Sequence, residues 1–384
     1  MNITIVVPYV GNFGQKGFYN SQEIGLSKVL ANHGNTVTVV RLHNKKVSSE
    51  INITEISNKI NLMSIPSNKF GTHGLFNMDY LDHLNSDIMI IFSDIQMIVP
   101  KIHRWAKKRN IRVIDYTGVV HSNSHKKYIR LLSNIITARN IICYRKSIVF
   151  AKTPEVFNEL KQRGVNDINL LHVGLDLDLM KIDFNTTDKK SLRNEFELDE
   201  NDIVIAFIGR LENDKKPLEL IALFKYLLSR DNRFRLLIVG SGKLKTEMLD
   251  LIKAFNLTNY IKHIEKLPND EIWKIYHCSN LFLNLCQNEI FGMCILESMY
   301  YECPVLAVSA PGPNFIIENY KDGLILDSSL NEEQCFISIN RILDDSSRII
   351  TNAKQKVMNE FVWENSALSL LSKIKYLKEK GIKS

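Results

Sequence analysis

Residues 281–306 contain the feature that most restricts the fold: a strand, a short polar loop, a helix and a second strand in direct succession. An apolar run from Leu281 to Leu285 predicts a buried strand, and the polar residues 287–289 interrupt it. Apolar residues then recur with helical spacing over about 293–301, and another strand begins at Pro304. Because a helix separates the two strands, we expect them to lie parallel in one sheet.

The same alternation of strands and helices occurs along most of the chain. The predicted strands are 3–8, 36–42, 87–92, 113–115, 147–150, 203–208, 234–239 and 261–264, in addition to 281–285 and the strand from 304. The predicted helices of the second half are 217–230, 243–255, 270–277, 293–301, 331–343 and 346–380. A polar stretch without periodicity follows His172 and reads as a linker. The fold class is therefore α/β, with two doubly wound domains that we expect to face a cleft.

The overall composition is typical of a globular protein that does not span a membrane. The chain has 384 residues, 45% of them hydrophobic, and no apolar run approaches the roughly 20 residues that cross a bilayer. Its first ten residues lack the basic and small-residue signals of a secretory leader. The six cysteines form no CxxC pair, which indicates reduced core residues of a cytoplasmic protein and not a disulfide framework or a zinc site.

Positive charge is concentrated in residues 101–163, which hold 15 Lys and Arg against 3 Asp and Glu, whereas the whole chain has a net charge of +7. Within this segment, basic residues alternate with Leu, Ile and Tyr, a pattern that suits a surface lying on anionic lipid. The alternative is an ordinary solvated face around a strand. Nucleic acid would also explain the charge, but we identify no recognition helix, RNA motif or zinc module and expect no nucleic-acid partner.

Two carboxylates and two cations are the main candidate site residues. Glu289 lies in the polar loop and Glu297 eight residues later in the helix, whose amino terminus favours phosphate. They would hold sugar hydroxyls on either side of a diphosphate; the alternatives are helix-dipole pairing for Glu289 and a solvated face for Glu297. Arg210 and Lys215 follow strand 203–208, at the strand end where an open α/β sheet binds its ligand, and their charges suit a diphosphate.

Two further patterns carry less information. Gly240-Ser241-Gly242 repeats the strand-to-glycine pattern and would let the backbone approach a ligand closely. Asp176-Leu177-Asp178 has the spacing of a metal motif, but it falls in the predicted linker, so we interpret it as structural and expect no metal site.

Several segments together resemble the family 4 glycosyltransferases, which are retaining enzymes of the GT-B fold. Arg210 and Lys215 lie in IGRLENDKKPLELI, LLIVGSGKLKTEM follows, and Glu289 and Glu297 form the Glu-x7-Glu pattern of NEIFGMCILESMYYECPVLAV. The resemblance covers nearly the whole chain and implies two Rossmann-like domains facing a central cleft. It implies an acceptor domain over 1–180, a nucleotide-sugar domain over 181–360 and a helix over 361–384 that packs back on the first domain.

The resemblance also implies roles for individual residues. Arg210 and Lys215 would hold the donor diphosphate, Glu289 the transferred sugar and Glu297 the ribose. His121 matches a histidine that faces the donor sugar in many members, although a lone histidine is equally well structural. The remaining donor-binding candidates are Gly17, Gly209, Lys266, Leu267, Phe291, Gly292 and Met293. No cofactor beyond the nucleotide sugar is implied.

Two departures from the family pattern affect specificity. Only Gly17 matches the paired glycines of the first loop, and the bulky Phe18 and Tyr19 follow it. Phe315 stands where the family often has a glutamate that contacts sugar.

The resemblance implies a retaining, metal-independent hexosyltransferase that uses a nucleotide diphosphate sugar, with UDP as the expected nucleotide. The expected acceptor is a glycan or a polyprenyl-diphosphate-linked glycan of surface polysaccharide synthesis. The expected location is the cytoplasm, peripheral at the inner face of the cell membrane through residues 101–163. The alternative is a catalytically silent GT-B subunit that supports another transferase.

Overall fold

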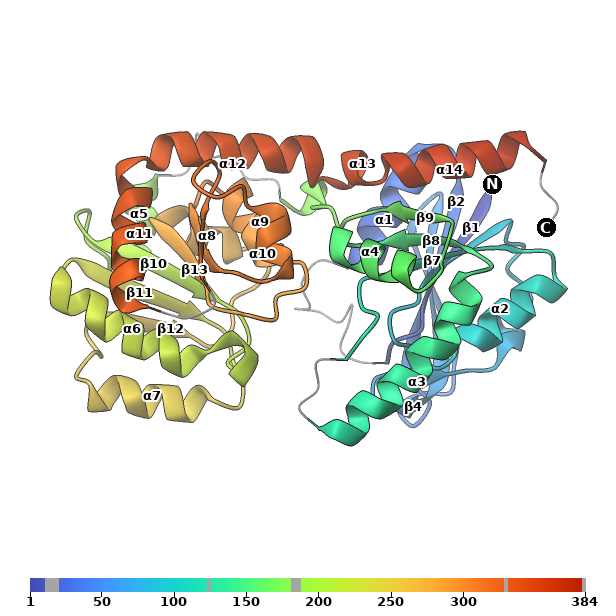
Figure 1. Ribbon diagram of the computed structural model, residues 1–384, viewed down its shortest axis with the longest axis horizontal. Helices are drawn as coiled ribbons and strands as arrows, with labels where there is room; N and C mark the ends of the chain where they lie inside the picture. Colours follow the sequence, from blue (N-terminus) through green and yellow to red (C-terminus); the bar gives the residue numbers. More distant parts are fainter. Residues whose placement is uncertain (11–20, 123–125, 181–187, 328–330, 382–384) are drawn as a thin grey trace. The chain divides into compact units, whose positions relative to one another are not determined.

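The computed structural model describes residues 1–10, 21–122, 126–180, 188–327 and 331–381 (Figure 1). The chain divides into two compact units. Unit 1 consists of Met1–Gly174 together with Trp363–Ser384, and unit 2 consists of Leu175–Val362. Each unit has its own parallel sheet and its own hydrophobic core.

Unit 1 is a doubly wound α/β structure, as its alternating strands and helices predicted. Its sheet has the strand order β3-β4-β2-β1-β6-β7-β8-β9, with β5 paired to β4, and the strands from β2 to β9 through β1 are parallel. Its strands are β1 (Asn2–Val7), β2 (Thr36–Asn44), β3 (Asn52–Ser57), β4 (Ile60–Phe70), β5 (His73–Leu75), β6 (Ile88–Phe92), β7 (Arg112–Thr117), β8 (Ile148–Ala151) and β9 (Ile168–Leu170). Its first helices are α1 (Gln22–Asn32), α2 (Val99–Lys108), α3 (Lys127–Tyr144) and α4 (Pro154–Gln162).

The strands β3, β4 and β5 were not predicted from the sequence. β4 pairs parallel to β2, and both β3 and β5 pair antiparallel to β4. Every residue of β3 is exposed, so this edge strand lacks the buried apolar face that sequence patterns detect. Its pairing extends the parallel sheet at one edge without adding to the core.

Unit 2 contains a second, wholly parallel sheet with the strand order β12-β11-β10-β13-β14-β15. The strands are β10 (Ile203–Ile208), β11 (Phe234–Val239), β12 (Ile261–Ile264), β13 (Leu281–Asn284), β14 (Val305–Val308) and β15 (Leu324–Leu326). The helices are α5 (Lys189–Glu195), α6 (Pro217–Arg230), α7 (Lys245–Ala254), α8 (Ile272–Cys278), α9 (Met293–Tyr300), α10 (Pro311–Ile316), α11 (Glu332–Asp344) and α12 (Ser346–Glu360). Because all six strands are parallel, their carboxyl ends meet at one edge of the sheet.

The single helix predicted over 346–380 is wrong, because the structure breaks it. α12 ends at Glu360, and two further helices follow, α13 (Trp363–Ser366) and α14 (Leu368–Glu379). At the break, the carbonyl of Phe361 accepts a hydrogen bond from the N–H of Leu175 at 2.7 Å, and Leu175 forms a bridge with Val362. A tertiary contact thus replaces the helical hydrogen bond that periodicity predicted.

The last helix packs on unit 1, as predicted (Figure 1, red). The hydroxyl of Ser369 donates to the carbonyl of Leu170 at 2.7 Å, and Lys373 pairs with Asp167 at 2.9 Å. Ahead of α14, the Trp363 indole lies so close to Gly25 of α1 that a Cβ on this glycine would fall 2.1 Å from Nε1 of Trp363. Within the described residues, no helix is both long and apolar enough to cross a membrane.

Candidate active site

The carboxyl edge of the unit 2 sheet brings together residues that are far apart in the sequence. β10 and β13 are hydrogen-bonded neighbours, so the loops that follow them lie side by side. The first loop carries Arg210 and Lys215, and the second carries Glu289. This adjacency places two cations and a carboxylate where an open parallel sheet binds its ligand, as the sequence analysis expected.

Lys215 and Glu289 form a direct ion pair. Nζ of Lys215 lies 2.6 Å from Oε2 of Glu289, and the two side chains are only 21% and 18% exposed. Burial disfavours the ammonium, but the Glu289 carboxylate outweighs that effect and raises the pKa of Lys215 above its ordinary value. Lys215 is therefore a permanent cation at neutral pH. The ion-pair partner of Glu289 is this lysine.

Arg210 is the exposed cation of the same loop. Its side chain is 68% exposed, and Nη2 donates to Asp214 at 3.0 Å. The loop ends at Lys216, whose left-handed backbone (φ 54°) turns the chain directly into Pro217 at the first position of α6. An exposed pair of this kind holds its arginine weakly, so an incoming anion can compete for the guanidinium.

Gly240 and Gly242, which follow β11, allow their loop to pack closely against the loop that follows β10. A Cβ on Gly240 would lie 1.8 Å from the carbonyl oxygen of Gly209, and one on Gly242 would lie 2.3 Å from that of Leu211. The loops are also joined by a hydrogen bond from Leu211 N–H to the Ser241 carbonyl at 3.0 Å. The close approach that these glycines permit is therefore to the β10 loop, which carries Arg210.

The Glu289 loop is fixed from both sides before α9 begins. Oδ1 of Asn284, at the end of β13, accepts from the Cys286 N–H at 2.9 Å, and the carbonyl of Glu289 accepts from the Gly312 N–H at 2.8 Å. Gly292 adopts φ 97°, which a side chain would strain, and Met293 starts the helix. The sequence analysis did not identify Asn284 as a residue that fixes this loop. Its position as the one polar residue in the apolar run 281–285 could have indicated that role.

Aromatic rings pack beside this loop. Phe291 lies against Phe315 and Phe361 with ring centroids 6.3 Å away in each case, and Phe315 meets Phe361 edge-on at 5.7 Å. Phe315 is thus part of an apolar wall, at a position where the resembling family often has a glutamate.

Glu297 lies inside unit 2, so the solvated-face interpretation of this residue was wrong. It is 1% exposed on α9, and its Oε2 accepts from the Tyr276 hydroxyl at 3.2 Å. Tyr276 stacks on Tyr301 with centroids 5.9 Å apart. Burial, followed by the charge of Glu297, raises the pKa of Cys294 and of Tyr301. The contact with ribose stays a prediction.

Two more donor-binding candidates, Lys266 and Leu267, follow β12. This strand is the edge neighbour of β11, so the loop opens at the same edge of the sheet as Arg210. Lys266 is exposed and Leu267 is half-buried. Their predicted contact with the nucleotide base stays a prediction.

The remaining candidates belong to unit 1. His121 follows β7, and its Nδ1 lies 3.0 Å from Oε2 of Glu159 on α4, which also pairs with Arg163 at 2.5 Å. This contact gives His121 a structural partner within unit 1, and its role toward a donor stays a prediction. Gly17, with Phe18 and Tyr19, lies outside the described residues.

The Asp-x-Asp pattern lies in the linker region and caps a turn. Oδ1 of Asp176 accepts from the N–H of Asp178 at 3.1 Å at the start of a short 3-10 helix, Leu177–Leu179. Over the ranges that the structure describes, no cluster of His, Cys, Asp and Glu is suited to a metal ion.

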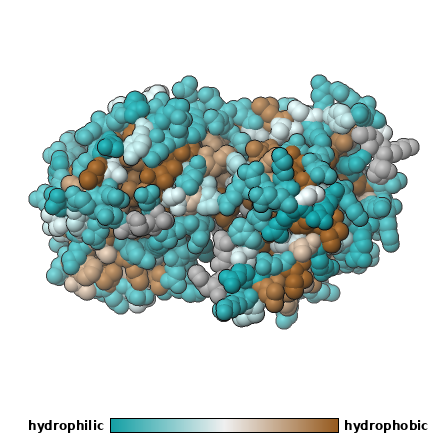
Figure 2. Space-filling view, viewed as in Figure 1, coloured by the Kyte–Doolittle hydropathy of each residue, from teal (hydrophilic) through white to brown (hydrophobic). Residues whose placement is uncertain are grey.

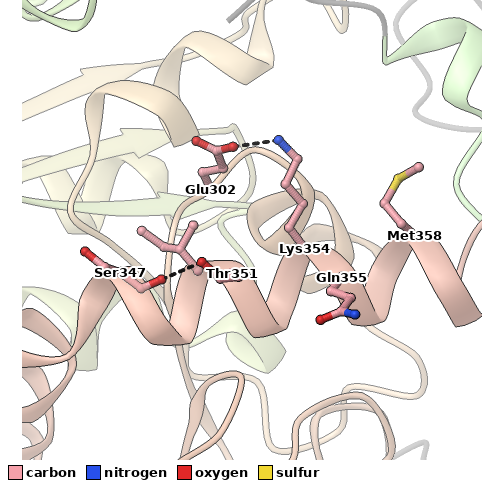
Figure 3. Close-up of a pocket in the computed structure, with 7 residues that line it drawn as sticks. Glu302, Ser347, Thr351, Lys354, Gln355 and Met358 are labelled. Atoms are coloured by element: carbon pink, nitrogen blue, oxygen red, sulfur yellow. Dashed lines mark hydrogen bonds and ion pairs between the residues drawn. The ribbon is translucent and has the colours of Figure 1, made fainter.

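A separate hollow of unit 2 lies along α12 (Figure 3). The Lys354 side chain reaches across it to Glu302 at 2.6 Å, and the Thr351 hydroxyl donates to the carbonyl of Ser347 at 2.9 Å. None of the predicted site residues lines it, so it is not the candidate site.

A comparison with known protein families finds a match for most of unit 2, which contains the candidate site. Residues 188–356 match the family model described as glycosyl transferases group 1. This segment, which makes up less than half of the chain, is similar to the group 1 glycosyl transferases. It contains Arg210, Lys215, Glu289 and Glu297, so the ion pair and the buried glutamate both lie within the matched segment.

Curated relatives carry the same kind of name at low identity. The chain is 23% identical over 272 residues to a glycosyltransferase of Methanocaldococcus jannaschii described as uncharacterized, covering 68% of this chain and 69% of that protein. It is 24% identical over 215 residues to a D-inositol 3-phosphate glycosyltransferase of Rhodococcus jostii, covering 54% of this chain and 46% of that protein. The chain thus spans about half the length of this second kind of relative.

Solved structures establish the fold over nearly the whole chain. Sucrose-phosphate synthase from Thermosynechococcus elongatus superposes with a TM-score of 0.76 at 17% identity, covering 99% of this chain and 100% of that one. HepE of Anabaena in complex with UDP and glucose superposes with a TM-score of 0.72 at 17% identity, covering 98% of this chain and 100% of that one. The predicted GT-B fold is therefore confirmed.

Proposed function

We propose that this protein is a retaining glycosyltransferase that moves a hexose from UDP-hexose to a hydroxyl of a glycan acceptor. The observation that carries the proposal is the Lys215–Glu289 ion pair beside the exposed Arg210 at the carboxyl edge of the unit 2 sheet. A diphosphate requires cations and a sugar requires hydrogen-bond acceptors, and this edge offers both.

The ion pair suggests how donor binding would proceed. Lys215 and Glu289 satisfy each other at 2.6 Å. A donor would place phosphate oxygens against Lys215 and Arg210 and sugar hydroxyls against Glu289, so each group exchanges one partner for another. The exchange keeps the Lys215 ammonium and the Glu289 carboxylate compensated, which limits the cost of their partial burial.

The same residues suggest how transfer would proceed. The bond between the anomeric carbon and the diphosphate oxygen breaks, the acceptor oxygen bonds to that carbon on the same face, and the acceptor proton passes to the departing phosphate. Arg210 and Lys215 would stabilise the charge that develops on the leaving group, without a metal ion or a protein nucleophile. Glu289 would hold the sugar in place during the exchange.

The choice of UDP rests on a solved structure of the same fold, because HepE binds UDP and glucose. The proposed acceptor is a glycan on a polyprenyl diphosphate, used in surface polysaccharide synthesis by an enzyme lying peripherally on the inner face of the cell membrane. The support for this part is the excess of Lys and Arg in residues 101–163. An anionic bilayer attracts such a surface.

A thermal-shift screen of nucleotide sugars tests donor binding, because a ligand that binds the native state raises its melting temperature. We expect a UDP-hexose to give the largest shift. Proton NMR of donor hydrolysis then tests the stereochemistry, and the α-anomer of the sugar should form first from an α-linked donor. Initial release of the β-anomer would contradict retention. Binding without any hydrolysis or transfer would favour a catalytically silent subunit.

A further inference from the structure

Helix α3 (Lys127–Tyr144) of unit 1 is apolar on two opposite sides. One side is buried and contains Ile136, Asn140, Ile141 and Tyr144, of which Ile141 and Tyr144 belong to the unit 1 core. The other side exposes large apolar side chains to solvent, with Tyr128 67% and Leu131 65% exposed. A helix on the surface of a globular protein normally has a polar outer face, so this outer face is unusual.

All the exposed large apolar residues of α3 except Ile129 lie on one side of the helix and form a stripe. The stripe consists of Tyr128, Leu131, Leu132, Ile135 and Ile142. At 100° per residue, these positions fall within about a third of the circumference, opposite the buried side. The stripe runs for about 21 Å along the helix axis, since each residue adds about 1.5 Å. Figure 2 shows hydrophobic side chains gathered where α3 lies in Figure 1.

Cations surround the stripe at both ends. Lys126, Lys127 and Arg130 are exposed at its amino-terminal end, and Arg139, Arg145 and Lys146 are exposed at its carboxy-terminal end. The neighbouring helix α2 adds the exposed Arg104 and Lys107. An apolar stripe flanked by Lys and Arg matches the chemistry of an anionic lipid surface, with acyl chains for the stripe and phosphates for the flanks.

A cavity of about 580 Å³ opens beside the carboxy-terminal end of the stripe. Ile142 of the stripe lines it, and so do the cations Arg104, Lys107, Arg112, Arg139 and Lys146. Its lining contains no Asp or Glu, and none of these five cations forms an ion pair with a described residue. Nε of Arg112 is buried there without a hydrogen-bond acceptor in the described parts of the chain.

The nearest carboxylate does not neutralise this cavity. Asp115 is completely buried beneath it, accepts from the Ser147 hydroxyl at 2.6 Å and pairs with His103 at 3.0 Å. The cavity therefore keeps an excess of positive charge that a phosphate group would compensate.

We propose that α3 and the cationic cavity beside it form a docking surface for an anionic phospholipid bilayer. The apolar stripe enters the headgroup region, and the cavity receives a lipid phosphate. This inference rests on the proposed function. It adds the surface through which the enzyme would reach a lipid-linked acceptor.

Co-sedimentation of the full chain with vesicles tests this surface. We expect binding to phosphatidylglycerol-containing vesicles, little binding to pure phosphatidylcholine, and a decrease with added sodium chloride. The double variant Arg139→Glu/Lys146→Glu should weaken anionic binding by roughly tenfold or more. Leu131→Ser/Ile135→Ser should weaken it comparably. All four side chains are exposed or half-exposed, so the variants should fold, as an unchanged melting temperature would show.

Matched controls lie elsewhere on the surface. Lys375→Glu on α14 and Ile337→Ser on α11 change an exposed cation and an exposed apolar residue, and we expect both to bind vesicles like the unaltered protein. Equal binding to both kinds of vesicle, or no binding, would overturn the proposal. So would loss of binding in the controls, or full binding by the Leu131→Ser/Ile135→Ser variant.

Two other occupants would also overturn the proposal. Sedimentation velocity would reveal a second copy, if the unaltered protein were a dimer that Leu131→Ser/Ile135→Ser separates. Tighter binding to duplex DNA than to anionic vesicles would indicate nucleic acid. UDP-hexose hydrolysis in vesicle-free buffer is measured in parallel, and the surface variants should retain it. Vesicle binding without hydrolysis would remove the proposed function alone, and hydrolysis without vesicle binding would remove the docking surface alone.

Discussion

Lys215 and Glu289 are 74 residues apart in the sequence and 2.6 Å apart in the structure, because they follow two neighbouring parallel strands. Their pairing joins the β10 loop to the loop that precedes α9. It connects a local sequence pattern to the electrostatics of the proposed donor site.

A double-mutant cycle measures how strongly the two side chains interact. Lys215→Met and Glu289→Gln should each lower the free energy of unfolding, with a coupling energy of about 1 kcal/mol or more, since both groups are largely shielded from water. Urea denaturation of the four proteins gives this value. The exposed pair Lys321–Glu318, at 2.8 Å, is the matched control and should couple by less than about 1 kcal/mol. Equal coupling in both pairs would contradict the account.

The pH dependence of stability follows from the raised pKa of Lys215. A lysine whose pKa rises on folding stabilises the native state below its unfolded pKa, about 10.4, and loses that contribution as the pH climbs through the folded value. The difference in melting temperature between the unaltered protein and Lys215→Met should therefore stay constant from pH 7 to 9 and shrink only in stronger base. A difference that grows between pH 7 and 9 would show that folding lowers the pKa of Lys215, and would contradict this prediction.

Arg193 should be the most sensitive cation of unit 2 for stability. It is buried and donates to the carbonyls of Cys278, Asp199, Glu200 and Asp202 and to the Asn280 side chain. Arg193→Met leaves these acceptors buried, so the free energy of unfolding should fall by roughly 3 kcal/mol or more. Arg233→Met, at an exposed pair, should cost less than about 1 kcal/mol. Similar decreases in the free energy of unfolding of the two variants would contradict the prediction that the buried hydrogen bonds of Arg193 stabilise unit 2.

The contact between Gly25 and Trp363 should tie the C-terminal helices to unit 1. Gly25→Ala places a methyl group inside the contact radius of the indole and should destabilise the protein by roughly 1–3 kcal/mol. Limited proteolysis should then cut more readily near residue 363. Adding Trp363→Leu should restore part of the lost stability, because it removes the clash. If adding Trp363→Leu to Gly25→Ala lowers the stability further, the contact between Gly25 and Trp363 is wrong.

Much of unit 2 was predictable because its strands are rich in apolar residues and most end at polar or glycine residues. β10, β11 and β12 begin and end where the sequence predicted. The helix α10 was missed because Pro311-Gly312-Pro313 suggests a turn, yet the Pro311 ring suits a first helical position. The break after α12 was missed because a hydrogen bond from Leu175, distant in sequence, creates it.

The candidate site was predictable in its residues but not in its contacts. The spacing of Glu289 and Glu297 gave no indication that one pairs with a lysine and the other lies buried against Tyr276. Those outcomes depend on which loops the sheet brings together. The charge of residues 101–163 was visible in the sequence, whereas the exposed apolar stripe of α3 required knowledge of which helix face is buried.

Release of UDP from a UDP-hexose is the most direct test of the proposed donor site. We expect the unaltered protein to release UDP, and Arg210→Ala to do so on the order of 10²–10³ times more slowly with an unchanged melting temperature, since Arg210 is 68% exposed. Arg230→Ala, at an exposed pair on α6, serves as the control and should retain full activity. UDP release by Arg210→Ala at the rate of the unaltered protein would contradict the assignment of this edge as the catalytic site.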